Sequence, residues 1–312
     1  MYVYTHPHTH AHTIMVKSYN PGYPPLAFFL NKTGRPVFLS TEYPLYQKAH
    51  GIKPNYKDLS KICNMARNYK DMQDSWDSIL STVEYYGNNE DGFAEAAGPG
   101  FFNDPDMPDY KLIAKSCNIW RNFADVQDSW DSVLGIINFY AEDKTRFREV
   151  AAPGQFNDPD MLIIGNFGLS RDQEKVQMAM WSIMASPLIM STDLSKIRPY
   201  SKALLLNKGA IAINQDPMGI QGRRLMKVGN IQIWTRPVLP EGSFAFAFLN
   251  TGTGGTPQKV SIAVKDLGFT KPSGYNITEV FSGQFLAKRR PNDTFTAEIN
   301  PTGIFFGKAT LL

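Results

Sequence analysis

An internal duplication limits how the region between residues 56 and 161 can fold. Residues 56–107 align without gaps on residues 110–161, and 27 of the 52 aligned pairs are identical. Each copy contains C-N-x-x-R-N-x-x-D-x-Q-D-S-W-D-S and ends with P-G-x-F-N-D-P-D-M. So many identities predict that the two copies fold alike, but two copies are fewer than the three or more repeats of a stable solenoid. We therefore expect one duplicated unit within a larger globular fold.

Strand-like and helix-like segments alternate around and within the two copies. The predicted elements are strands at 35–40 and 187–192, two short strands in each copy (one at C-N-x-x-R-N, one running into N-D-P-D), and helices at 75–86 and 129–140. Ser170 and Gln173 form the pattern of a capping box, which begins an amphipathic helix that ends before Pro187. Strands that alternate with helices are typical of parallel βα units.

The pattern changes near residues 217–222. Short strands separated by Gly, Pro and Asn turns are predicted at 230–237, 243–250, 259–267, 276–282, 294–300 and 303–311. The segment SFAFAFLN alternates with a period of two, as a strand with one buried face does. This region therefore predicts an antiparallel β-sandwich.

Composition excludes several classes of function. Lys and Arg outnumber Asp and Glu by 32 to 29, so the net charge of +3 gives no case for nucleic acid or a membrane surface as partner. The only cysteines, Cys63 and Cys117, form neither a disulfide framework nor a zinc site, and there is no Gly-rich phosphate loop. We predict no metal and no organic cofactor. Alternating histidines within residues 1–21 allow a weak metal-binding tail, but a disordered tail is the simpler interpretation.

Acidic residues follow the predicted strands. They are Glu42, the Arg–Asp pairs Arg67/Asp71 and Arg121/Asp125, and Asp106 and Asp160 at the ends of the two N-D-P-D-M motifs. Polar residues just beyond the strands line the active mouth of a (β/α) barrel, and two carboxylates are the working groups of most glycosidases. The same residue types also form turns and helix caps, so this spacing alone leaves both interpretations open.

Longer motifs carry a family resemblance from about Gly22 to the end of the chain. They are NKTGRP at 31–36, TEYPLY at 41–46, KPNY at 53–56, CNIWRNFADVQDSW at 117–130, AAPGQFNDPDMLIIGNFGLS at 151–170, PLIMSTDL at 187–194 and IAINQDPMGIQGRR at 211–224. In this order they resemble the retaining α-galactosidases and α-N-acetylgalactosaminidases of glycoside hydrolase family 27. The resemblance implies an α/β fold: a partial (β/α)8 TIM barrel of later strands, with one segment duplicated, at 22–217, followed by an antiparallel β-sandwich domain at 218–312.

The resemblance also implies an activity, the retaining hydrolysis of terminal non-reducing α-D-galactosyl residues. The family's acid/base aspartate falls on Asp125, with Arg121, Asp160 and Met161 as sugar-binding residues, or on Asp71, with Arg67, Asp106 and Met107. The second copy is preferred because IWRNFAD keeps the family's Trp before the arginine and because this copy continues directly into LIIGNFG. The first copy follows the Glu42 segment with the family's usual spacing, so a mixed site stays open.

The resemblance places the sugar specificity in the segment of Glu42, Leu45 and Tyr46. Galactosidases of the family resemble Glu…Leu here, whereas the acetamido enzymes have Ser…Ala. Glu42 can accept a hydrogen bond from the sugar O2 hydroxyl, and Leu45 fills the space that an acetyl group needs. This predicts galactose specificity. An α-N-acetylgalactosaminidase and a non-catalytic sugar-binding protein or fragment remain the alternatives.

Three departures from the family pattern bear on activity. No segment of the printed sequence matches the family's K-F/Y-D-G nucleophile motif, so we expect the chain as printed to be inactive. Thr41 and Tyr43 stand where the family has Cys and Trp, so the cysteine that would pair with Cys63 or Cys117 is missing. The duplication inserts 54 residues, and six strand candidates precede the sandwich where a closed barrel has eight. We interpret the chain as a partial or misassembled α-galactosidase.

Location and assembly rest on the resemblance alone. It implies a lysosomal or secreted glycoprotein, although no signal peptide begins the printed sequence, and N-glycosylation sequons occur at Asn31, Asn276 and Asn292. Family members are often homodimers, and the residues themselves neither favour nor exclude a homodimer here.

Overall fold

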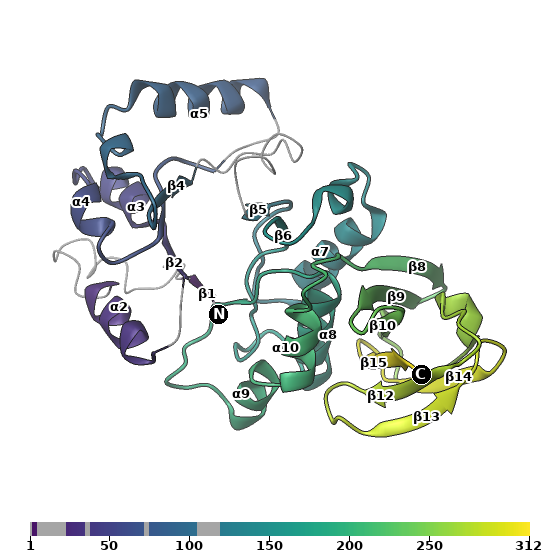
Figure 1. Cartoon of the computed structure of the whole chain (residues 1–312). Helices are drawn as coiled ribbons and strands as arrows, with labels where there is room; N and C mark the ends of the chain where they lie inside the picture. The colour runs from purple at the N-terminus through teal and green to yellow at the C-terminus, as the bar shows by residue number, and fades with distance from the viewer. Residues whose placement is uncertain (1, 5–22, 35–37, 72–74, 105–118) are drawn as a thin grey trace. The chain divides into compact units, whose positions relative to one another are not determined.

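The computed structural model describes residues 2–4, 23–34, 38–71, 75–104 and 119–312. They divide into two compact units (Figure 1): unit 1 is Met1–Asp109 with Leu188–Ser191, and unit 2 is Tyr110–Pro187 with Thr192–Leu312. Three residues with predicted roles, Asp106, Met107 and Cys117, lie outside the described residues.

Unit 1 contains a parallel five-stranded sheet in the order β4-β3-β2-β1-β7. Its strands are β1 (Tyr2–Tyr4), β2 (Phe38–Thr41), β3 (Met65–Arg67), β4 (Phe102–Asp104) and β7 (Ile189–Met190). Its helices are α2 (Tyr23–Lys32), α3 (Tyr43–Ala49), α4 (Tyr56–Leu59), α5 (Trp76–Asn88) and the 3-10 turn η1 (Ala94–Ala96). Within the described residues this sheet is open at β4 and β7, as expected of a partial barrel.

Strand β1 was not expected, because residues 1–21 were predicted to be a disordered tail. That prediction is wrong for Tyr2–Tyr4, which pair in parallel with both β2 and β7. Tyr-Val-Tyr combines aromatic and β-branched residues, which favour a strand, and the facing edges of β2 and β7 offer backbone groups that need partners. The remainder of 1–21 lies outside the described residues.

The core of unit 1 contains Thr41, which stands where the family has a cysteine, and Cys63, which therefore has no disulfide partner at that position. Thr41 is buried, and its Oγ1 accepts the N–H of Tyr43 at 3.0 Å, which helps to begin α3. Cys63 is a buried free thiol whose Sγ donates to the carbonyl of Leu59 at 3.2 Å. Burial raises the pKa of Cys63 to about 12, so the thiol is neutral and acts as a small core residue.

Unit 2 begins with a two-stranded parallel sheet and a layer of helices. The strands are β5 (Ile119–Arg121) and β6 (Phe156–Asp158), and the helical elements are α7 (Trp130–Glu142), η2 (Phe147–Val150), α8 (Arg171–Ile183), α9 (Pro199–Leu205) and α10 (Lys208–Asn214). The predicted capping box at Ser170 and Gln173 is confirmed at the start of α8. Helix α8 is buried almost throughout, from Val176 to Ile183, and contacts α7, α9 and α10.

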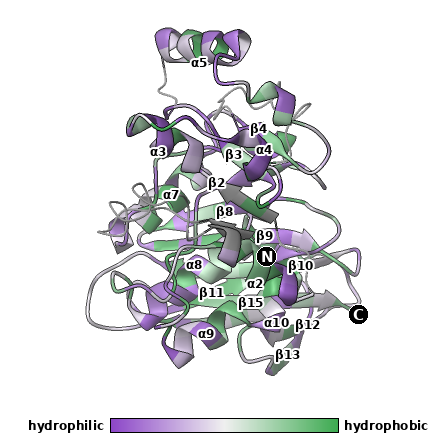
Figure 2. Cartoon of the chain, turned by 90° about the vertical axis from the view of Figure 1, so that its left-hand side faces the viewer, coloured by the Kyte–Doolittle hydropathy of each residue, from purple (hydrophilic) through white to green (hydrophobic). Residues whose placement is uncertain are grey.

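The rest of unit 2 is the predicted antiparallel sandwich. One sheet has the order β13-β12-β15-β10-β9-β8 and the other pairs β11 with β14. The strands are β8 (Arg223–Val228), β9 (Ile231–Val238), β10 (Ser243–Asn250), β11 (Gln258–Ala263), β12 (Tyr275–Glu279), β13 (Phe285–Arg289), β14 (Thr294–Ile299) and β15 (Ile304–Leu311). Phenylalanines 246, 248, 269 and 295 fill the core, and hydrophobic residues gather around β9, β10 and β15 (Figure 2).

The sandwich differs from prediction in three elements. The strand expected at 259–267 ends at Ala263 and continues as the 3-10 turn η3 (Val264–Leu267), where Val264 and Leu267 are buried and Gly268 ends the turn at φ 88°. Strands β8 and β13 were not predicted. Both are rich in Lys and Arg and only partly buried, so the period-two hydrophobic signal is weak there.

The two copies of the repeat have the same local structure. Ser75 and Ser129 cap α5 and α7 through bonds of 3.3 Å, and both helices end on a left-handed residue, Asn89 at φ 47° or Asp143 at φ 42°. Packing differs, because α7 buries Val133, Ile136 and Ile137 against neighbours that include α8 and β8. On α5, Trp76 is 71% exposed and Val83 is 51% exposed, so Trp76 is not the core residue that a tryptophan usually is.

Arg236 joins the sandwich to the helices of unit 2. It is fully buried on β9, and its Nη1 donates to the carbonyls of Ser182 at 2.6 Å and Asn214 at 3.4 Å. These carbonyls lie at the C-terminal ends of α8 and α10, where a positive charge is favourable. Burial lowers the pKa of Arg236 to about 10, so the guanidinium stays charged at neutral pH.

Replacing Arg236 by Met should test this joint. Arg236→Met keeps much of the side-chain volume but removes the donor from two buried carbonyls, so we expect the free energy of unfolding to fall by about 1–3 kcal/mol. Urea unfolding followed by tryptophan fluorescence measures the change. Arg236→Lys, which keeps a charged donor, should lose less. Equal stability of wild type and Arg236→Met would show that the two carbonyls do not depend on this guanidinium.

Candidate active site

Strand register brings Glu42 and Arg67 together in unit 1. Strands β2 and β3 pair in parallel with Ser40 opposite Met65 and Thr41 opposite Ala66, so the next pair along is Glu42 and Arg67. Arg67 Nη1 lies 3.1 Å from Glu42 Oε1, and both side chains are buried. This pair stands at the C-terminal ends of parallel strands, where barrel enzymes place their active sites.

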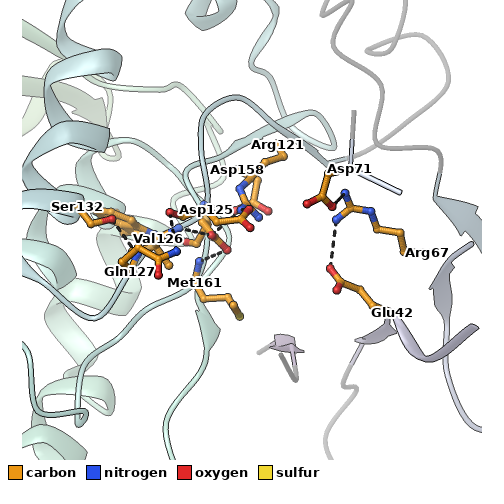
Figure 3. A network of polar contacts seen from close by, with 12 residues as sticks. Glu42, Arg67, Asp71, Arg121, Asp125, Val126, Gln127, Ser132, Asp158 and Met161 are labelled. Atoms are coloured by element: carbon orange, nitrogen blue, oxygen red, sulfur yellow. Dashed lines mark hydrogen bonds and ion pairs between the residues drawn. The ribbon is translucent and has the colours of Figure 1, made fainter. Parts of the chain in front are cut away.

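Two further side chains, Tyr46 and Asp71, complete this group, named cluster 1: Glu42, Tyr46, Arg67 and Asp71. Figure 3 shows Glu42, Arg67 and Asp71 of this cluster. Arg67 Nη2 donates to Asp71 Oδ1 at 2.6 Å, and the Asp71 side chain is 60% exposed. The Tyr46 hydroxyl donates to Glu42 Oε2 at 3.2 Å. Burial, together with the neighbouring Glu42 charge, raises the pKa of Tyr46, so this phenol remains a proton donor at neutral pH. Leu45, on the same helix turn, is half-buried.

Unit 2 contains a second arginine–carboxylate group, named cluster 2: Arg121, Asp125 and Asp160. Figure 3 shows Arg121 and Asp125 of this cluster. Arg121 Nη2 pairs with Asp125 and lies 2.6 Å from Asp160 Oδ2. The Asp125 side chain is 51% exposed, whereas that of Asp160 is 3% exposed. In both clusters, one arginine therefore holds one buried and one exposed carboxylate.

Asp160 is fixed from several sides. Its carboxylate accepts the N–H of Val126 at 2.7 Å and of Met161 at 2.8 Å, and its own carbonyl accepts Trp181 Nε1–H at 2.7 Å. Its backbone has φ 77°, a left-handed conformation that is uncommon for a residue other than glycine. Burial raises the pKa of Asp160, although Arg121 and the two amides act in the opposite direction.

The predicted site residues thus fall into two groups. Glu42, Tyr46, Arg67 and Asp71 meet in unit 1, and Arg121, Asp125, Asp160 and Met161 meet in unit 2. Among the described residues, no group of three or more His, Cys, Asp or Glu side chains could hold a metal ion. None of the described helices is both long and apolar enough to cross a membrane.

A pair of asparagines, of which all but the half-buried Asn103 are buried, supports each cluster and was not singled out from the sequence. Asn68 Nδ2 donates to Asn103 Oδ1 at 2.7 Å, and Asn122 Nδ2 donates to Asn157 Oδ1 at 2.9 Å. Each pair links the residue after the cluster arginine to the neighbouring strand of its own copy. The available signal was their identity in both copies, since these are the asparagines of the R-N and F-N-D motifs.

Asp128 is a second support that sequence reasoning missed. Its carboxylate accepts the N–H groups of Phe167 at 3.2 Å and Gly168 at 3.1 Å. A Cβ on Gly168 would lie 2.0 Å from the Asp128 carbonyl oxygen, so only glycine fits this contact. The loop that carries Asp125 is therefore anchored three residues further on.

Parallel strands that end in arginine-linked carboxylates, followed by an antiparallel sandwich, are the arrangement expected of a barrel-type glycoside hydrolase. The family model for alpha galactosidase A matches this chain twice, at residues 10–108 and 106–216, and the model for the C-terminal beta sandwich domain of alpha galactosidase A matches residues 219–303. The chain belongs to the alpha-galactosidase A family, glycoside hydrolase family 27, which confirms the resemblance.

Individual relatives agree with this assignment. The chain is 39% identical over 284 residues to alpha-N-acetylgalactosaminidase of Gallus gallus, an alignment that covers 91% of this chain and 56% of that protein. It is 46% identical over 202 residues to alpha-galactosidase A of Homo sapiens, covering 63% of this chain and 46% of that protein. The chain thus spans about half the length of the curated relatives it matches.

Solved structures support the fold. Alpha-galactosidase I of Mortierella vinacea aligns with a TM-score of 0.73 at 19% identity, over 93% of this chain and 80% of that chain. An alpha-galactosidase of Saccharomyces cerevisiae aligns with a TM-score of 0.71 at 18% identity, over 94% of this chain and 83% of that chain. The fold class is therefore a partial (β/α)8 barrel followed by an antiparallel sandwich.

Burial of Asp160 predicts a pH dependence of stability. The pKa of Asp160 is higher in the folded state than in the unfolded state, so the folded state binds this proton more tightly. The protonated carboxyl therefore adds to the free energy of unfolding at low pH. This contribution is lost as the pH rises from below 3.8, the ordinary value, through the raised pKa. Asp160→Asn removes this titration. We therefore expect the stability of the variant relative to wild type to increase as the pH rises through that window.

Urea unfolding of wild type and Asp160→Asn at a series of pH values measures this difference. Asp125→Asn is the matched control, because its side chain is 51% exposed and its replacement should change the unfolding free energy by no more than about 1 kcal/mol. A constant difference between wild type and Asp160→Asn across the series would contradict the prediction.

Proposed function

We propose that this chain carries the sugar-binding and acid/base half of a retaining glycosidase site for terminal α-D-galactosyl groups. The observation that carries the proposal is the arrangement of one arginine between a buried and an exposed carboxylate at the ends of parallel strands, present in both clusters. Family membership supports the same reaction class.

The two kinds of carboxylate suit two roles. The exposed aspartate, Asp125 in cluster 2 or Asp71 in cluster 1, is the proton donor to the departing glycosidic oxygen and then the base that activates water. The buried carboxylates Glu42 and Asp160 accept hydrogen bonds from sugar hydroxyls, since their partners already fix their orientation. In the second copy, Arg121 orients the acid/base, and Met161, which follows Asp160 in the sequence, contacts the sugar. In the first copy, Arg67 and Met107, which follows Asp106, take these roles.

Retaining hydrolysis also needs a second carboxylate as nucleophile, about 5–5.5 Å from the acid/base. No segment of the printed sequence matches the K-F/Y-D-G motif that supplies it in the family. We therefore propose that this 312-residue chain alone binds galactose without hydrolysing galactosides. Turnover would require a nucleophile supplied by additional sequence.

Sugar specificity is proposed to lie with Glu42 and Leu45. The Glu42 carboxylate, fixed by Arg67 and Tyr46, can accept the O2 hydroxyl of galactose, and Leu45 occupies the space of a 2-acetamido group. The second candidate, α-N-acetylgalactosaminidase activity, is favoured by the 39% identity to the Gallus gallus enzyme of that name.

We also propose a lysosomal or secreted location for this chain. Lysosomal or secreted glycoproteins of this family would carry sugar at sequons, and Asn31 and Asn292 are both exposed. A homodimer is proposed from the family alone.

Isothermal titration of the printed chain with galactose and with N-acetylgalactosamine tests the proposal. We expect galactose to bind at least about tenfold more tightly than N-acetylgalactosamine. The double variant Glu42→Ser/Leu45→Ala opens the acetyl space and should reverse this preference, whereas Leu45→Ala alone should only weaken it.

The nitrophenyl α-galactoside assay tests the catalytic half. We expect no turnover by the printed chain. Turnover that disappears in Asp125→Asn or Asp71→Asn would show a complete site and contradict the incomplete-site proposal. Absence of binding to both sugars would contradict the sugar-binding function itself.

A further inference from the structure

Three side chains in unit 1 tie the helix that follows Glu42 to the first copy of the repeat. Lys48, in the last turn of α3, donates from Nζ to the hydroxyl of Tyr85 and lies 3.0 Å from Asp91 Oδ2. Tyr85 in turn donates to Asp91 Oδ2 at 2.8 Å. The Lys48 and Asp91 side chains are only 22% and 23% exposed, so this contact is better shielded from water than an ordinary surface ion pair.

The second copy cannot form the same contact. In the gapless alignment, Tyr85 corresponds to Phe139, which lacks the hydroxyl, and Asp91 corresponds to Thr145, which lacks the charge. The ring packing itself is shared, because Tyr69 stacks on Tyr85 at 4.3 Å between ring centroids and Phe123 stacks on Phe139 at 4.5 Å. The copies therefore differ in the polar groups that Lys48 requires and not in the shape of this helix face.

The contact bears directly on Glu42. Helix α3 is only seven residues long, with Glu42 at its N-cap and Lys48 in its last turn. The contacts of Lys48 with Tyr85 and Asp91 therefore hold the whole helix against the first copy. At the other end, Arg67 of the same copy holds the Glu42 carboxylate at 3.1 Å. Both ends of α3 are thus fixed by side chains from the first copy.

We propose that the first copy, not the second, supplies the arginine and the acid/base aspartate that act with Glu42, namely Arg67 and Asp71. In this proposal Lys48, Tyr85 and Asp91 are positioning residues that fix α3, and hence Glu42, to that copy. The inference rests on the proposed sugar-binding function and deepens it. It differs from the preference for Asp125 and Arg121 that the motifs alone suggest.

The duplication supplies a matched pair of variants for the first test. Galactose is titrated calorimetrically into the wild-type 312-residue chain and into the Arg67→Lys and Arg121→Lys variants, which carry the same chemical change in the two copies. We expect the Kd for galactose to rise about tenfold in Arg67→Lys, because the forked contact to Glu42 and Asp71 is lost, and by at most about threefold in Arg121→Lys, which disturbs only the contacts to Asp125 and Asp160.

A second test exchanges the positioning residues between the copies. Tyr85→Phe/Asp91→Thr gives the first copy the aligned residues of the second, and we expect the Kd for galactose to rise about threefold or more. The mirror variant, Phe139→Tyr/Thr145→Asp, should leave the Kd unchanged. A double-mutant cycle with Lys48→Met shows whether the effect acts through Lys48. We expect Lys48→Met to weaken galactose binding in the wild-type chain but to cause no further weakening in the Tyr85→Phe/Asp91→Thr variant. A general loss of structure would instead weaken binding in both backgrounds.

The outcomes separate this inference from the function on which it rests. Wild-type chain that binds neither galactose nor N-acetylgalactosamine overturns the proposed function and the assignment with it. Binding that is weakened by Arg121→Lys as much as or more than by Arg67→Lys leaves the sugar-binding function in place and overturns the assignment to the first copy. If Arg67→Lys does not fold, as judged by circular dichroism, the exchange variants and their cycle decide the assignment.

Discussion

A parallel strand needs a hydrogen-bonded neighbour, and the helix that follows it needs a surface for its apolar face; the duplicated unit must satisfy both needs twice. The first copy pairs β3 with β2 inside a five-stranded sheet. The second copy pairs β5 and β6 with each other and buries α7 against α8 and β8, among other neighbours. Local structure is the same in both copies because their caps and turns are the same, but neighbours outside the repeat decide which faces are buried.

A buried or half-buried guanidinium imposes the second constraint, because its charge must be met by carboxylates or carbonyls. Arg67 and Arg121 each meet two carboxylates, so each cluster carries one formal negative charge in excess. Such a cluster favours hydrogen-bond donors, and sugar hydroxyls are donors. Arg236 solves the same problem differently, since it uses the carbonyls at two helix ends and thereby fixes the sandwich to the helices. The charge requirement shapes a candidate site in one case and an internal joint in the other.

Local signals in the sequence predicted much of this structure. The helices α5 and α7, the capping box of α8 and the central strands of the sandwich follow from spacing and caps, which need only neighbouring residues. What could not be predicted depends on partners distant in the sequence: β1 between β2 and β7, the charged strands β8 and β13, and the exposure of α5. In the candidate site, the motifs identified the arginines and carboxylates, whereas the Asn68–Asn103 bridge and the Asp128 anchor required the fold.

Motif matching has a particular limit in a duplicated chain, because residues that carry chemistry are the ones most alike in the two copies. Arg67 and Arg121, or Asp71 and Asp125, are the same residue type at the same spacing, so they cannot show which copy serves a site. Residues that differ between copies carry that information. Tyr85 and Asp91 hold α3 through Lys48, and their counterparts Phe139 and Thr145 lack the groups to do so. The choice between two equal sets of working groups therefore depends on the packing contacts that orient them.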